Sequence, residues 1–342
     1  MSARCLPFLL LVACSGDKTA PTDSAPADSA PADTGQACGD GSPADLEGCV
    51  DLDRISSDLN TVAEERTPGS AHWQEVQDLC AQRLADLGFA VELHTYDTGV
   101  NVIGTRTGAT DPDTQVLISA HYDAVPGCAG ADDNASGVAA LLESARVLAT
   151  VDHDRTLVVA CWDEEEDGLL GSEAWATEAA ARGDQLAAVY VYETIGYRDP
   201  EPDTQTLPSG FDTVFPDAAA ELAARGYTGD FLFYAADEAH AAAADALEAA
   251  AAEVDLPLIG VLLPDTLKNS RLASDLRRSD HASFWEVDLP GLFVTDTADF
   301  RNAAYHCQGA EDTVDRLDLD FIRVNTAATV GATARMLVGA AR

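Results

Sequence analysis

The sequence is poor in basic residues. Its 342 residues include 20 lysines and arginines against 59 aspartates and glutamates, a formal net charge of -39. Phosphate binding needs clustered Lys and Arg, so this balance argues against a nucleic-acid-binding protein. It also argues against docking on an anionic membrane through a basic face. The acidity favours high solubility, and a preference for cationic substrates stays open.

Long apolar runs are also scarce near the N-terminus, where residues 5–12 form a run too short to span a membrane as a mature helix. Arg4 precedes this run, and the tetrapeptide at residues 11–14 resembles a bacterial lipobox. We therefore expect a lipoprotein signal peptide over residues 1–13, with Cys14 as the lipidated residue of an exported cell-envelope protein. The alternative is an ordinary signal peptide cleaved at the same place, which would give a secreted protein.

The segment at residues 14–37 is dominated by Pro, Ala, Asp, Ser and Thr. Such a composition cannot offset the entropy of ordering, so we expect a disordered tether between anchor and domain. The remainder, residues 38–342, is long enough for one catalytic α/β domain, and 46% of the whole chain is hydrophobic. We expect this domain to be monomeric and to meet a membrane only through the N-terminal lipid.

The chain has eight cysteines but no CxxC pair, which argues against a cysteine-based zinc site. In an exported protein, disulfides are the natural expectation. Cys38 and Cys49 would close a short loop after the tether, and this is the first pairing we expect. Cys128 and Cys307 both lie beside the polar motifs described below, so they could also meet. The pairing of the other cysteines stays open.

Apolar periodicity predicts two N-terminal helices followed by alternating strands and helices. The expected helices cover residues 46–65, 71–87, 138–148, 172–181, 239–252 and 321–338. The expected strands cover residues 89–96, 100–105, 116–120, 157–162, 186–192, 258–263 and 292–295. This order predicts an α/β fold, a three-layer sandwich in which helices flank a mainly parallel mixed sheet.

Polar side chains follow three of these strands. His121 and Asp123 follow the third strand, an acidic run at residues 163–166 follows the fourth, and Glu193 follows the fifth. Sites in such sheets form at the carboxyl ends of strands, and a run of acids there repels itself unless cations bind. Imidazole and carboxylate are zinc ligands. Asp123 could accept a hydrogen bond from the ring nitrogen of His121 that does not bind metal.

Six motifs occur in order along the chain, at residues 120–128, 130–137, 165–172, 193–197, 279–285 and 295–306. Together they resemble the co-catalytic zinc aminopeptidases of metallopeptidase family 28, whose fold is that of zinc exopeptidases (phosphorylase/hydrolase-like). This family also includes transferrin-receptor-like and glutaminyl-cyclase-like members. The resemblance implies a protein that cleaves residues from the N-terminus of peptides with two zinc ions. By ligand type alone, cobalt or manganese could replace zinc.

The resemblance also implies a role for each motif residue. His121 and Glu193 would bind one zinc, Glu166 and His306 the other, and Asp132 would bridge them. The linkage from Asp132 to the next residue is one that the family often holds as a cis peptide.

The same resemblance makes Glu165 the general base, because the Glu-Glu-x-Gly-Leu pattern aligns only from that residue. Asp123 is counted with it as a catalytic residue. Two positions depart from the family: many members have Asp where this chain has Glu193, and Cys307 replaces the usual Thr. Asp280, His281, Arg301 and Tyr305 are candidates for the substrate pocket. For His281 a supporting role behind the pocket stays open, and for Arg301 a structural salt bridge is an equal alternative.

Three other functions stay open at this point. A glutaminyl-cyclase-like acyltransferase would share the fold and use one zinc. A carboxypeptidase or dipeptidase would share the fold and the metals. A non-catalytic binding module, as in receptor relatives, is disfavoured because Glu165 and the expected ligands are all present.

Overall fold

The computed structural model describes residues 38–339. The predicted signal peptide, the predicted lipidation site at Cys14 and the predicted tether all lie outside the described residues. Within the described part, no helix is both long and apolar enough to cross a membrane.

The N-terminal region forms three helices, α1 (Pro43–Glu47), α2 (Leu52–Val62) and α3 (Ala71–Asp86). The single helix predicted over residues 46–65 is therefore two helices. The chain leaves α1 at Gly48, and the Asp51 side chain starts α2 by accepting hydrogen bonds from the backbone N–H groups of Asp53 and Arg54. Cys38 and Cys49 form a disulfide around α1.

Eight strands form one mixed sheet in the order β1-β2-β4-β3-β5-β8-β6-β7. Their bounds are β1 Ala90–Thr95, β2 Val100–Arg106, β3 Asp111–His121, β4 Arg155–Trp162, β5 Gln185–Glu193, β6 Leu232–Asp237, β7 Leu258–Leu263 and β8 Leu292–Thr295. The central strands β4, β3, β5 and β8 run parallel, whereas β1 with β2, β2 with β4, and β6 with β8 are antiparallel. The prediction of a mainly parallel mixed sheet is confirmed.

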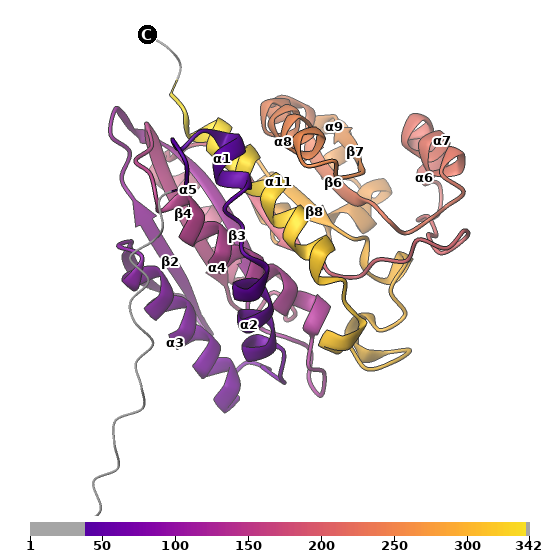
Figure 1. The fold of residues 1–342 in the computed structure, drawn as a ribbon, viewed down its shortest axis with the longest axis horizontal. Coiled ribbons are helices and arrows are strands. Elements are labelled where there is room, and N and C mark those ends of the chain that lie inside the picture. The colour runs from indigo at the N-terminus through magenta and orange to yellow at the C-terminus, as the bar shows by residue number, and fades with distance from the viewer. Residues whose placement is uncertain (1–37, 340–342) are drawn as a thin grey trace, which may run out of the picture. The chain divides into compact units, whose positions relative to one another are not determined.

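Helices cover both faces of the sheet, because its central strands are apolar on both sides. Along β3, Val116 and Ile118 belong to one buried core and Leu117 to the other. The first face is covered by α2, α3, α4 (Gly137–Leu148), α8 (Ala241–Glu253) and α11 (Leu319–Leu337). In Figure 1, α2, α4 and α11 lie side by side across this face.

The second face is covered by α5 (Leu170–Arg182) and α10 (His281–Glu286), which pack on each other. The short helices α6 (Phe211–Val214) and α7 (Pro216–Ala224) join the same core. These two helices, β6 and α9 (Asp265–Lys268) were not predicted. The helices are short, from 4 to 9 residues, and give little periodicity to detect.

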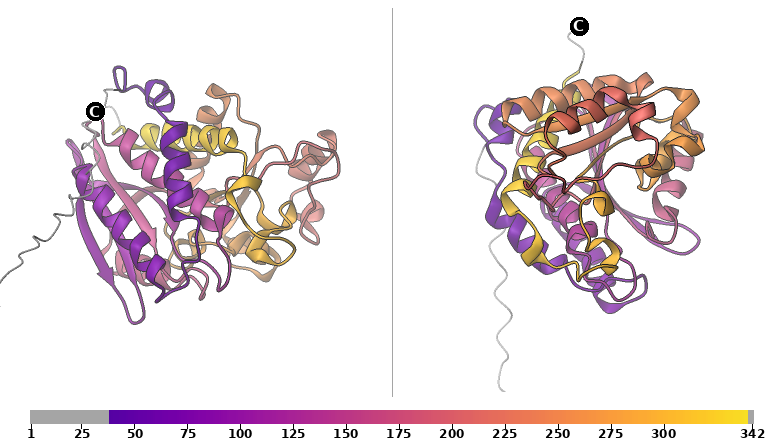
Figure 2. Two further views of the ribbon diagram at one scale, coloured as in Figure 1. Left: turned by 60° about the horizontal axis from the view of Figure 1, so that its bottom comes forward. Right: turned by 90° about the vertical axis from the view of Figure 1, so that its right-hand side faces the viewer.

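The irregular segments are a π-type turn over Ala131–Ser136 and several short 3-10 turns. The 3-10 turns cover Glu238–His240, Arg271–Arg277, Ala298–Phe300, Tyr305–Cys307 and Val314–Arg316. In Figures 1 and 2, the gold segment before α11 lies beside the magenta Ala131–Ser136 turn, and hydrogen bonds from the backbone of that turn to the Asp312 carboxylate join the two. Both segments lie at the edge of the sheet where β3 and β5 end.

Candidate metal centre

A first group of donors forms where β3 and β5 end. His121 is the last residue of β3 and Glu193 the last of β5, so parallel neighbours bring both side chains to one edge. The Nε2 atom of His121 lies 3.5 Å from an oxygen of Glu193 and 4.0 Å from an oxygen of Glu165. One donor atom from each of these residues lies within 4.8 Å of the others.

A second group consists of Asp133, Glu166 and His306, whose donor atoms also lie within 4.8 Å of one another. The Nε2 atom of His306 lies 3.1 Å from Asp133 Oδ2 and 3.2 Å from Glu166 Oε2. Glu166 comes from the loop after β4, and His306 comes from the 3-10 turn Tyr305–Cys307. Three distant parts of the chain therefore meet at this group.

Asp133, and not Asp132, lies between the two histidines. Its Oδ1 is 3.3 Å from His121 Nε2, while its Oδ2 faces His306. The side chain of Asp132 is used elsewhere, since it accepts hydrogen bonds from the Gly196 backbone at 2.9 Å and from Asn302 at 2.8 Å. The prediction that Asp132 bridges the two sites is corrected to Asp133. The cis peptide bond likewise lies one residue later than expected, between Asp133 and Asn134.

Sequence reasoning missed this because both residues are aspartates in an irregular turn. No periodicity applies there, so the pattern could not say which of the two carboxylates faces the histidines. The only sequence signal was the run of two acids itself.

Asp123 links the end of β3 to the acidic loop that follows β4. One of its oxygens lies 3.3 Å from His121 Nδ1 and also accepts a hydrogen bond from the Glu165 backbone N–H. Its other oxygen accepts from the Glu166 backbone N–H at 3.1 Å. The structure thus places Asp123 as the residue that orients the imidazole and fixes the acidic loop.

Several supporting residues were not predicted. Asp163 anchors the same loop by accepting hydrogen bonds from Trp73 Nε1 at 2.7 Å and the Val100 backbone at 2.9 Å. Ser279 donates to Glu193 at 2.7 Å. Asp312 accepts from the backbone N–H groups of Asp132 and Asp133. These contacts join residues 63 to 180 positions apart in the chain, so no local sequence pattern predicts them.

The pKa values of the ionisable groups in the site are strongly shifted. Burial raises the pKa values of Glu165, Glu166 and Glu193, and that of Glu166 reaches about 7. Burial lowers the pKa of His306, but the facing carboxylates Asp133 and Glu166 raise it more, to about 10. Burial opposes ionisation of Asp133, yet the two histidines that face its carboxylate hold its pKa below the ordinary value. The site therefore favours positive charge at its centre.

The donors present fit divalent metal ions. Nε2 of both histidines and one oxygen each of Asp133 and Glu166 are buried, and form no hydrogen bond within residues 38–339. Buried polar atoms without partners are costly, and coordination would satisfy all four. Imidazole and carboxylate together are the ligands that zinc takes.

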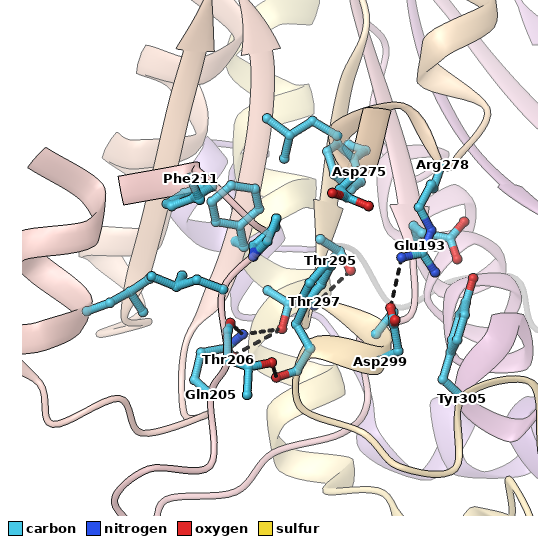
Figure 3. Close-up of a pocket in the computed structure, with 18 of the residues that line it drawn as sticks. Glu193, Gln205, Thr206, Phe211, Asp275, Arg278, Thr295, Thr297, Asp299 and Tyr305 are labelled. Atoms are coloured by element: carbon cyan, nitrogen blue, oxygen red, sulfur yellow. Dashed lines mark hydrogen bonds and ion pairs between the residues drawn. The ribbon is translucent and has the colours of Figure 1, made fainter. Parts of the chain in front are cut away.

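A mostly apolar cavity opens beside this centre, with Glu193 and Tyr305 in its wall. Figure 3 shows Glu193, Arg278 and Tyr305 at one end and Phe211 toward the other. Its apolar lining consists of Leu207, Phe211, Leu222, Phe231, Phe233, Leu276, Phe293 and Phe300. The charged residues Asp275, Arg278 and Asp299 are exposed in its wall.

Of the four expected pocket residues, only Tyr305 lines this cavity. Arg301 is buried and donates to Gln205 Oε1 at 2.8 Å and to the Phe231 carbonyl at 2.9 Å, so it holds the cavity wall from behind. His281 is fully buried, bonds the Leu276 carbonyl and stacks on Phe293, and its pKa is lowered by burial to about 3. Of the alternatives that the sequence left open for Arg301 and His281, the structure favours the structural one for both residues.

Asp280 is also fully buried and does not line the cavity. Burial raises the pKa of Asp280 to about 7. The charge of His121 lowers this pKa, and the charge of Glu193 raises it. Its expected place in the pocket is therefore corrected to a place behind the first group of donors.

This fold and this donor set define an α/β protein with a candidate two-metal centre. The profile of Peptidase family M28 matches residues 101–333, more than half of the chain, and the chain belongs to this family. The family resemblance seen in the sequence is confirmed.

Two curated relatives are similar over part of their length. Uncharacterized protein YfbL of Escherichia coli (strain K12) is 30% identical over 214 residues, 59% of this chain and 61% of that protein. Aminopeptidase YwaD of Bacillus subtilis (strain 168) is 44% identical over 80 residues, 23% of this chain and 17% of that protein. The matches thus span less than two thirds of these relatives.

Solved structures share the fold at low sequence identity. The Legionella pneumophila LapA aminopeptidase has a TM-score of 0.65 at 17% identity, covering 86% of this chain and 74% of that one. The zinc aminopeptidase BSAP from Bacillus subtilis has a TM-score of 0.64 at 13% identity, covering 86% and 97%. A glutaminyl cyclase from Fimbriiglobus ruber has a TM-score of 0.58 at 15% identity, covering 83% and 95%. The predicted fold class is confirmed.

The two adjacent aspartates should respond differently to loss of charge. We expect Asp133→Asn to lower zinc affinity by more than about 10-fold, because the two histidines favour the charged carboxylate there. Asp132→Asn should retain zinc, because burial raises the pKa of Asp132 well above its ordinary value and so favours the neutral form. Zinc per chain, measured by mass spectrometry after dialysis against a zinc buffer, checks both. Equal retention by the two variants would contradict the assignment.

The metal-free protein should lose stability as the pH rises. The pKa of Glu166 is raised from 4.5 to about 7, and that of His306 from 6.5 to about 10. The folded state therefore binds these protons more tightly than the unfolded chain, and this stability disappears between about pH 4.5 and about pH 10. Thermal midpoints of chelator-treated protein across this range test it. Glu166→Gln should flatten the acidic half of the decline, and a midpoint that rises with pH would refute the account.

Proposed function

We propose that this protein is a zinc-dependent aminopeptidase with two metal ions bridged by Asp133. The observation that carries the proposal is the position of the Asp133 carboxylate, whose two oxygens face the two histidines separately. One ion would be held by His121, Asp133 and Glu193, and the other by Glu166, Asp133 and His306. Metal ions bound there would activate a water molecule and polarise the scissile carbonyl.

Glu165 is the general base of this proposal. With Asp133 shared between the groups, Glu165 is the carboxylate left free, and its oxygen is the farthest of three from His121 Nε2, at 4.0 Å. Burial raises the pKa of Glu165 well above its ordinary value, which suits a group that must take up a proton. Glu165 would accept a proton from the attacking water and return it to the departing amine.

The cavity beside Glu193 would receive the side chain of the first residue of the peptide. Its lining is largely phenylalanine and leucine, so it would favour large apolar side chains. The free amine of the substrate would lie near the carboxylates at the cavity's end, where negative charge is concentrated. This arrangement explains how the protein would select a peptide N-terminus.

The alternatives have less support. A one-zinc glutaminyl-cyclase-like activity leaves the second donor group without a role. A carboxypeptidase needs a cation for the terminal carboxylate. Among the described residues lining the cavity, only Arg278 is basic, and it is paired with Asp299 at 2.9 Å.

The N-terminal sequence supports export and lipidation at Cys14, followed by a tether that would let the domain reach peptides near the membrane. The disulfide between Cys128 and Cys307 is consistent with an oxidising compartment. We include this anchor in the proposal.

Removing the base should separate metal binding from catalysis. Glu165→Gln should keep two zinc ions but lower kcat on aminoacyl-nitroanilides by about 100-fold to 10,000-fold, the range typical of general-base loss. Glu164→Gln is the matched control, since the Glu164 side chain hydrogen-bonds Thr98 instead, and it should stay close to wild type. Wild-type protein that holds two zinc ions and releases no nitroaniline would rule out the function.

The cavity predicts substrate preference. Leu- and Phe-nitroanilides should exceed the Gly and Lys substrates in kcat/KM by more than about 10-fold, because each buried methylene adds discrimination. Leu207→Trp, which fills part of the cavity, should reduce turnover of Phe more than that of Ala. Leu272→Trp, at a position 78% exposed, should leave this ratio unchanged. A preference for Lys would show that the cavity does not receive the side chain.

Lipidation can be tested by labelling. The full chain expressed in a bacterium fed an alkynyl fatty acid should become labelled and partition with membranes, while Cys14→Ser should do neither. Labelling of both proteins, or of neither, would contradict the predicted anchor.

A further inference from the structure

His306 has the weakest structural support of the expected ligands. It belongs to the single 3-10 turn Tyr305–Cys307, and its side chain is 25% exposed. His121, by contrast, ends a central strand and is fully buried. The side-chain packing at this turn includes stacking of the Tyr305 ring on His306, with centroids 3.8 Å apart, and the exposed Arg278 over the Tyr305 ring. The position of His306 must therefore be fixed by something outside regular structure.

The backbone at this turn is also unfavourable. His306 and Cys307 are consecutive non-glycine residues in the left-handed region, with φ of 54° and 56°. Side chains other than glycine rarely adopt this conformation, and they keep it only when the surroundings impose it. A local turn with these dihedral angles would relax if its surroundings released it.

The Cys128–Cys307 disulfide supplies that restraint. It joins the residue next to His306 to a loop 179 residues earlier in the chain, with Cα atoms 5.7 Å apart. That loop is itself held, because the fully buried Arg66 donates to the Ala129 carbonyl at 2.6 Å and to the Gly130 carbonyl at 2.8 Å. The bond therefore fastens the His306 turn to an anchored part of the molecule.

Asp312 makes the effect of the disulfide specific to His306. Its carboxylate accepts hydrogen bonds from the backbone N–H groups of Asp132 and Asp133, so the bridging aspartate has a restraint in addition to the disulfide, although the Asp312 backbone N–H also contacts Cys307 Sγ at 3.4 Å. Breaking the bond would free the turn at residues 305–307 while Asp133 and the first donor group keep their places.

We propose that Cys128 and Cys307 are positioning residues whose disulfide holds His306 in place, so that binding of the second metal ion depends on this bond and binding of the first does not. The inference rests on the two-metal centre of the proposed function. It assigns a role to Cys307, one of the two positions at which the sequence departs from the family pattern.

The first test counts metal and does not depend on activity. Equilibrium dialysis against buffered zinc should give two ions per chain for wild type and for the control C38S/C49S, which lacks the other described disulfide. C128S/C307S should hold one ion, with the second site weakened by more than about 10-fold. Two ions at wild-type affinity in C128S/C307S would overturn the inference. A wild-type chain with a single ion would overturn the two-metal function as well.

The second test starts from folded protein, in case C128S/C307S does not fold. Zinc-loaded C38S/C49S is treated with a water-soluble phosphine and iodoacetamide. The phosphine breaks the S–S bond and becomes a phosphine oxide with oxygen from water, leaving two thiols that are alkylated. About one zinc per chain should be released as Cys307 becomes alkylated, as read with a chromogenic chelator. Complete alkylation of Cys128 and Cys307 without zinc release would refute the proposal.

Discussion

Glu165, Glu166 and Glu193 are crowded together at the ends of parallel strands, where burial keeps water from screening their charges. Burial is the main cause of their raised pKa values, and repulsion by neighbouring carboxylates adds to it. Two histidines and an ionised Asp133 share the space, and Nε2 of both histidines and one oxygen each of Asp133 and Glu166 make no hydrogen bond within residues 38–339. The site therefore suits bound cations, which would supply positive charge between these carboxylates.

The surrounding structure holds this costly arrangement in place. Parallel pairing of β3 with β4 and β5 brings the strand ends to one edge. Asp123 then joins the first histidine to the acidic loop, and Asp312 clamps the turn that carries Asp133. Each contact uses a carboxylate to order a backbone or an imidazole, so the acidity of the chain serves the geometry of the site as well as its charge.

The cavity and the donors are contributed by different parts of the chain. The donors other than His306 lie between residues 121 and 193, while the walls come mostly from residues 205–300. Arg301 and His281, buried behind those walls, set the position of Gln205, Phe231 and Phe293. The chemistry and the choice of substrate can therefore vary separately, and the Cys128–Cys307 bond links the two parts.

The sequence by itself determined the order of the longer helices and of seven of the eight described strands, the α/β class and the strand ends that carry His121 and Glu193, because apolar periodicity reports which face of an element is buried. Only the tertiary structure decided between Asp132 and Asp133, which are chemically identical neighbours in a turn without periodicity. It also decided the cavity wall and the structural roles of Arg301 and His281. Those features depend on contacts between segments far apart in the chain, and such contacts leave no local pattern.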